Sequence, residues 1–131
     1  MYLLDTNVCI QYLNGNAQIQ QRLLSCERSQ ISTCEIVRFE LYYGAFSSRR
    51  ALENVALLNT FFEPLIVFPF DAAAAIKCGE IRSQLKRQGQ PIGPYDLQIA
   101  AIALSRNLVL VTHNVREFCR VEGLRWEDWE G

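Results

Sequence analysis

The feature that most constrains the fold is the alternation of short apolar segments with longer segments that carry apolar residues at helical spacing. Four short segments have the length and composition of strands: Tyr2–Leu4, the residues around Ile31, residues 65–68 and residues 108–111. A strand that is apolar throughout buries both of its faces, as strands do in a parallel sheet covered by helices. The alternation therefore predicts an α/β chain, a three-layer α/β/α fold around a central parallel sheet of about four or five strands.

The segments between these strands carry helix start and stop signals. Caps, breakers and apolar spacing predict helices from residues 5–7 to Leu13, around 19–24, over 34–46 and 52–62, from Asp71 to Gly89, and from Pro94 to residues 106–107. A short last strand is expected around residues 124–126. In a parallel sheet, ligands bind beyond the carboxyl ends of the strands, so the residues that follow Leu4 and Val111 are expected to face the site.

Length and composition exclude several classes of protein. The chain has 131 residues, which suits one domain over residues 1–131, and 50% of them are apolar, which excludes intrinsic disorder. A formal net charge of −1 argues against a protein that holds nucleic acid by bulk electrostatics. The apolar runs are too short for a membrane span, and no secretory signal precedes Asp5, so we expect a cytoplasmic protein without a membrane partner. The five cysteines contain no C-x-x-C pair, which argues against a disulfide framework or a zinc knuckle.

Three acidic residues are candidates for a metal site. Asp5 follows the first strand, Asp96 lies in the first turn of the helix before the fourth strand, and Glu40 lies mid-helix among apolar neighbours. Each has a simpler explanation, since Asp caps helices and a helical Glu can face solvent. Gathered at one sheet edge, however, they would repel, and without a cation at least one would take up a proton. Mg²⁺, with Mn²⁺ as a substitute, accepts such oxygen ligands and leaves positions open for phosphates.

Four segments in this order carry a family resemblance: residues 4–7 (LDTN), 37–45 (VRFELYYGA), 91–100 (PIGPYDLQIA) and 111–118 (VTHNVREF). With them, the chain resembles the PIN-domain ribonucleases of the VapC family, the toxins of type II toxin–antitoxin pairs. The resemblance implies a Mg²⁺-dependent endoribonuclease that hydrolyses RNA phosphodiester bonds through a metal-activated water. It also implies a cognate antitoxin protein as partner, and a homodimer.

The resemblance assigns site residues position by position. Asp5, Glu40 and Asp96 match the catalytic, metal-binding positions, and four further residues are secondary candidates: Asn7, Thr112, Asn114 and Glu117. The chain departs from the fullest pattern because Asn114 stands where many members have Asp, with Glu117 three positions on. We therefore expect one tight metal ion and a second that the substrate phosphate helps to hold.

Other residues around the expected site have supporting roles in this hypothesis. Arg38 and Arg116 are candidates for steering the RNA backbone. His113, the only histidine, is expected on the rim rather than as general base, because no orienting partner is evident in the sequence. The aromatic residues of 39–46 and 61–62 exceed what a small core needs and suggest a groove for the antitoxin.

Two other functions remain as alternatives. A PIN fold kept as a catalytically weak RNA- or protein-binding module would explain the missing fourth aspartate. A magnesium-binding receiver domain has similar layering, but it needs an aspartate at the end of the third strand, where residues 67–70 read Val-Phe-Pro-Phe. A phosphatase with an aspartyl nucleophile is disfavoured because residues 5–7 lack the second aspartate of a D-x-D loop.

Overall fold

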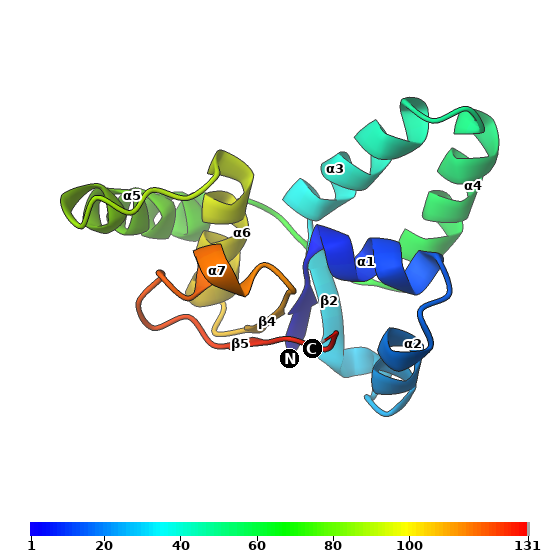
Figure 1. Cartoon of the computed structure of the whole chain (residues 1–131), viewed down its shortest axis with the longest axis horizontal. Coiled ribbons are helices and arrows are strands. Elements are labelled where there is room, and N and C mark those ends of the chain that lie inside the picture. Colours follow the sequence, from blue (N-terminus) through cyan, green and yellow to red (C-terminus); the bar gives the residue numbers. More distant parts are fainter. Residues whose placement is uncertain (131) are drawn as a thin grey trace.

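The structure is a computed structural model that describes residues 1–130 (Figure 1). Along the chain the elements are β1 Tyr2–Leu4, α1 Thr6–Leu13, α2 Ala17–Leu24, a 3₁₀ turn Arg28–Gln30, β2 Ile31–Cys34, α3 Glu35–Phe46, α4 Ala51–Phe62, β3 Ile66–Phe68, α5 Ala72–Arg87, α6 Pro94–Ser105, β4 Val109–Val111, α7 Val115–Phe118 and β5 Trp126–Glu127. The chain thus alternates strands and helices as the apolar pattern predicts.

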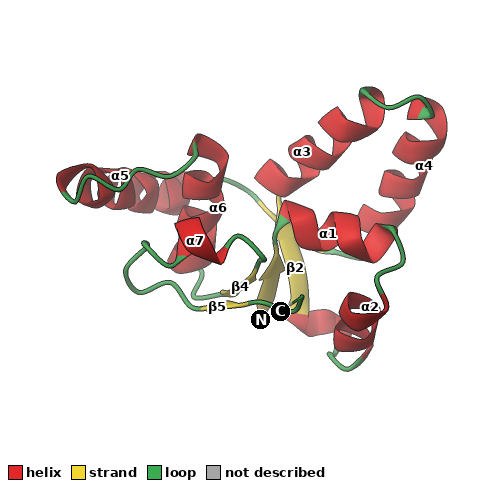
Figure 2. Cartoon of the chain, in the orientation of Figure 1, coloured by secondary structure: helices red, strands yellow, loops and turns green. Residues whose placement is uncertain are grey.

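All five strands are parallel, in the order β3-β2-β1-β4-β5. Leu3 of β1 pairs with Ser32 on one side and with Leu110 on the other, which places β1 at the centre. The predicted fold class is confirmed: helices lie on both sides of a parallel sheet, with α1, α2 and α4 on one side and α5, α6 and α7 on the other (Figure 2).

The core lies between the sheet and the two helical layers. β1 buries Leu3 and Leu4 almost completely, and β4 does the same with Leu110 and Val111, because both faces of these strands are covered. Helix α6 buries a run of small and branched residues from Ile99 to Ala103, so it is enclosed nearly all round rather than amphipathic. Because α6 is enclosed in this way, its position is fixed. The positions of its first-turn residues, which include Asp96, are therefore fixed as well.

The carboxyl ends of β2, β1 and β4 form one edge, and three helix starts lie there. β1 leads through Asp5 into α1, β2 leads directly into α3, and β4 leads through residues 112–114 into α7. The Asp5 backbone N–H donates to the Val111 carbonyl at 3.0 Å, which ties the two loops together beyond the strands. The expected location of the site is therefore built by the topology itself.

The structure differs from the sequence predictions in details. The last strand begins two residues later than expected, at Trp126, and Leu124 instead packs in the core. Helix α7 was not predicted, because a single turn is too short to show helical periodicity. The cysteines are all unpaired, with Cys9 and Cys34 buried and Cys119 exposed. Within residues 1–130, no helix is both long enough and apolar enough to span a bilayer.

Candidate active site

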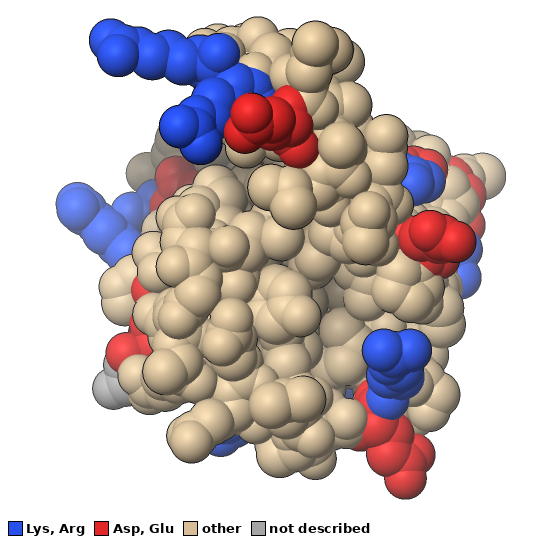
Figure 3. Space-filling view, turned by 90° about the vertical axis from the view of Figure 1, so that its right-hand side faces the viewer, with Lys and Arg blue, Asp and Glu red and all other residues tan. Residues whose placement is uncertain are grey.

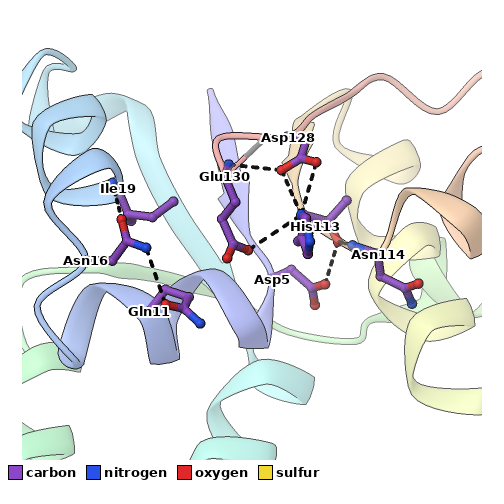
Figure 4. Close-up of polar contacts among 9 residues, drawn as sticks. Asp5, Gln11, Asn16, Ile19, His113, Asn114, Asp128 and Glu130 are labelled. Atoms are coloured by element: carbon purple, nitrogen blue, oxygen red, sulfur yellow. Dashed lines mark hydrogen bonds and ion pairs between the residues drawn. The ribbon is translucent and has the colours of Figure 1, made fainter.

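Asp5 contributes a buried carboxylate to the candidate site, and two donors hold it in place. One oxygen accepts from the Thr6 backbone N–H at 2.8 Å, as the cap of α1, and the other accepts from the Thr112 hydroxyl at 2.8 Å (Figure 4). Burial raises the pKa of Asp5, and the two hydrogen bonds oppose that rise. Asp5 is therefore both a helix cap and a carboxylate positioned by its neighbours, so the two readings of the sequence do not compete.

Glu40 reaches the same edge from the second turn of α3. Its Oε1 accepts from the Thr6 hydroxyl at 3.0 Å, so Thr6 contacts Asp5 through its backbone and Glu40 through its side chain. Sequence reasoning did not single out Thr6 as a site residue, although it stands in the LDTN segment. Glu35, five residues earlier, instead forms an ion pair with Arg38, with the shortest N–O distance 2.6 Å.

The opposite side of the cluster consists of Asp96, Asn114 and Glu117. The Asn114 amide donates to Asp96 Oδ2 at 2.8 Å and to Glu117 Oε2 at 3.2 Å, so one side chain holds both carboxyl groups. Glu117 also accepts from the Gly93 backbone N–H at 3.3 Å. Asn114 is itself oriented, because its backbone N–H donates to the Thr112 hydroxyl at 2.9 Å. Thr112 thereby links the Asp5 side of the site to the Asp96 side.

The carboxylates of the site repel one another, and this repulsion contributes to the raised pKa of Asp96. Burial raises the pKa of Asp96 to about 8, aided by its contact with Glu117 and by the negative charges of Asp5 and Glu40. The same contact holds the pKa of Glu117 below its usual value. At neutral pH a proton thus lies between these two groups and belongs mainly to Asp96. The direction of the rise in the pKa of Asp96 agrees with the repulsion expected among clustered carboxyl groups.

The donor set fits a hard divalent cation. Asp5, Glu40, Asp96 and Glu117 offer only carboxylate oxygens, which are the ligands that Mg²⁺ and Mn²⁺ prefer. A cation at this edge would offset the repulsion that now holds a proton on Asp96. At the position where the family resemblance leads one to expect Asp, the Asn114 amide bridges two acidic groups, one of which is the nearby Glu117.

His113 has orienting partners that sequence reasoning missed. Its Nδ1 lies 3.1 Å from Asp128 and 3.9 Å from Glu130, two residues that alternate with the buried Trp129 at the end of the chain (Figure 4). The hydrogen bond that the Asp128 carboxylate accepts from the His113 ring is the main reason that the pKa of His113 is raised. His113 is exposed, in keeping with a rim position.

Across the described residues 1–130, the structure shows no hydrogen bond from the three remaining candidates, Asn7, Arg38 and Arg116, to Asp5, Glu40 or Asp96. Asn7 is exposed in the first turn of α1, and Arg116 is exposed on α7. The Arg38 guanidinium is occupied by Glu35 on one side and lies over the Phe62 ring at 5.5 Å on the other.

The fold and the site together define a class of protein. It is the class of three-layer α/β domains that carry acidic side chains at the carboxyl edge of a parallel sheet. Residues 2–124 match the PIN domain family. The chain therefore belongs to the PIN-domain family, in its VapC branch.

The relatives cover nearly the whole chain. The "tRNA(fMet)-specific endonuclease VapC" of Shigella flexneri is 43% identical over 129 residues, which is 98% of this chain and 97% of the relative. "Ribonuclease VapC2" of Rickettsia felis is 34% identical over 132 residues, 99% of this chain and 98% of the relative. Among solved structures, the DNA-bound VapBC of Salmonella typhimurium superimposes with a TM-score of 0.92 at 43% identity, covering 98% of this chain and 97% of the other.

Proposed function

We propose that this chain is a Mg²⁺-dependent endoribonuclease that hydrolyses RNA phosphodiester bonds, and that it is the toxin of a type II toxin–antitoxin pair acting in the cytoplasm as one domain over residues 1–131. The observation that carries the proposal is the cluster of carboxyl groups at the carboxyl edge of the sheet. There the pKa of Asp96 is raised to about 8. Relatives named as VapC ribonucleases over nearly the full length support it.

In this proposal Asp5, Glu40 and Asp96 hold the first cation, and Glu117 contributes to a second ion that the substrate phosphate completes. A bound divalent cation supplies two things at such a site: water that ionises more readily, and positive charge against the phosphodiester oxygens. Mn²⁺ is the expected substitute, because it accepts the same oxygen ligands.

The chain's own residues position these ligands. Thr112 fixes one oxygen of Asp5 and the Thr6 backbone fixes the other, so the carboxylate cannot turn away from the site. The Thr6 hydroxyl steadies Glu40. Asn114 keeps Asp96 and Glu117 together, and the proton on Asp96 must leave when a cation binds there. Ligands held in this way lose little freedom on binding, which lowers the entropic cost of the site.

The antitoxin partner is supported by the VapBC complexes among the structural neighbours. The helical face in Figure 3 is largely uncharged, and it holds a groove of about 830 Å³ between α1, α2 and α4. Leu24 and Leu57 line this groove and are 85% and 61% exposed. Phe61 belongs both to this groove and to the aromatic set expected from the sequence. We propose that an apolar segment of the antitoxin covers this groove, and that two toxin chains form a homodimer.

The proposal is tested by cleavage of end-labelled structured RNAs with Mg²⁺, with EDTA, and with the Asp96→Asn variant in parallel. We expect cutting that needs the metal and is lost in the variant. The control variant Glu80→Gln removes a carboxylate on α5 that pairs with Lys77 and should cleave normally. Cleavage that persists in EDTA or in Asp96→Asn would exclude the proposed site.

A second candidate function rests on Asn114, a neutral amide beside Asp96 at a position where the family resemblance leads one to expect a carboxylate. A PIN fold that binds RNA or protein without cutting would then bind Mn²⁺ in calorimetry yet leave every RNA intact. Growth arrest on expression of the wild-type chain, absent for Asp96→Asn, would decide for the nuclease.

A further inference from the structure

Phe39 of α3 and Tyr95 of α6 form an aromatic pair that the chain leaves open to solvent. Their ring centroids are 5.0 Å apart and their planes meet at 75°, an edge-to-face contact between two different helices. Phe39 is 43% exposed and Tyr95 is 46% exposed. A contact that served only the core would be expected to bury more of both rings, since aromatic side chains stabilise a fold mainly through buried area.

The pair lies beside the carboxylates of the candidate active site. Phe39 directly precedes Glu40, and Tyr95 directly precedes Asp96. Glu40 is held on one side of the site through Thr6, and Asp96 on the other through Asn114. The two rings therefore join α3 to α6 next to the acidic cluster, where these two helices stand on either side of the sheet edge (Figure 1).

On the α3 side of the cluster the charge distribution of the described residues offers RNA no unpaired arginine, so the exposed Arg116 of α7 is the cationic candidate on the other side. The carboxylates repel phosphate groups, and the nearest arginine on α3, Arg38, is ion-paired with Glu35. Stacking of a nucleobase on an aromatic ring does not depend on charge, and it is tolerant of base identity. An exposed ring beside an acidic site can thus hold RNA where a basic side chain would compete with the metal for the carboxylates.

We propose that Phe39 and Tyr95 form a stacking platform for one unpaired nucleobase next to the scissile phosphate, an inference that rests on the proposed ribonuclease function. The base must be unpaired, because a duplex keeps its bases stacked on one another and offers side chains no free ring face. The platform therefore selects single-stranded or looped RNA and sets which phosphate lies over the carboxylates.

The test compares the wild type with the double variant Phe39→Ala/Tyr95→Ala, and with Phe39→Tyr/Tyr95→Phe as the matched control that keeps both rings. With Mg²⁺, the alanine pair should raise KM for a single-stranded oligonucleotide by roughly 5- to 150-fold, while kcat changes little and the control stays near the wild type. With Ca²⁺ in place of Mg²⁺, 2-aminopurine at one position of the oligonucleotide should be quenched on binding, and the alanine pair should abolish that quenching.

Salt dependence separates stacking from charge. The alanine pair should leave the slope of log affinity against log salt unchanged, whereas Arg116→Ala should make it shallower. Unchanged KM and quenching in the alanine pair, with an active wild type, would overturn the platform and leave the nuclease intact. A wild type that neither binds nor cuts RNA would overturn both. If light scattering shows that the alanine pair turns a dimer into a monomer, the rings serve a second copy of the chain and the platform is wrong.

Discussion

Replacing Asp96 by Asn should stabilise the metal-free protein while it removes the metal site. The asparagine has the shape of the protonated acid, and its amide can still donate to Glu117 and accept from Asn114. In the wild type, by contrast, the folded chain has to keep a proton that the unfolded chain releases. The substitution removes that cost of folding.

The magnitude follows from the raised pKa. A rise from 3.8 to about 8 corresponds to an upper limit of roughly 6 kcal/mol at pH 8. Asp96 is only partly buried, and Glu117, which shares the proton, recovers part of the cost through its lowered pKa. We therefore expect a gain of about 1–3 kcal/mol in the free energy of unfolding, or a few degrees per kcal/mol in Tm for a chain of this length.

The pH dependence gives the prediction its sign. Well below pH 4 the carboxyl group is protonated in both the folded and the unfolded wild type, so wild type and variant should have similar stability. Above pH 4 the unfolded wild type ionises while the folded one keeps its proton, so the stability of the wild type relative to the variant falls until about pH 8. The difference should then level off.

The assay is urea unfolding of both proteins in EDTA at pH 4, 6 and 8, repeated at pH 8 with saturating Mg²⁺. Mg²⁺ should stabilise the wild type, by about 2.7 kcal/mol at one hundred times the dissociation constant, and should leave the variant nearly unchanged. A variant less stable than the wild type in EDTA at pH 8, or a gain that is the same at every pH, would refute the reasoning.

Four further predictions follow from contacts in the structure. The affinity for Mg²⁺ should rise as the pH approaches 8, with proton release on binding, measured by calorimetry in two buffers of different ionisation enthalpy. Thr112→Val removes a buried hydrogen bond to Asp5, so urea unfolding should show a loss of about 1–3 kcal/mol; no loss would mean that the bond does not matter. Gly15→Ala should cost about 1 kcal/mol, because Gly15 has φ +85°, and should leave RNA cleavage unaltered. His113→Ala should retain cleavage within tenfold of the wild type, and a larger loss would give this histidine a catalytic role.

Local sequence determined most of the architecture. Apolar segments predicted β1, β3 and β4, because a strand covered on both faces lacks polar positions, whereas β2 carries two buried polar residues, Ser32 and Thr33. Helix caps and breakers such as Asp71 and Gly89 set boundaries that the structure reproduces within a few residues, since these residues act on the backbone directly. Asp5 and Asp96 could be placed at the sheet edge for the same reason: each stands at a predictable helix start after or before a strand.

The contacts between segments that are distant in the sequence were decided only by the tertiary structure. The direction of the Glu40 side chain depends on the hydroxyl of Thr6, thirty-four positions away, and the proton on Asp96 depends on Glu117, twenty-one positions away. His113 meets Asp128 only because β5 extends the sheet beside β4 and carries the end of the chain back across it. Helical spacing shows which residues share a face, but pKa values and pairings depend on distances of a few ångströms between separate elements. Those distances exist only after the sheet and its two helical layers have packed.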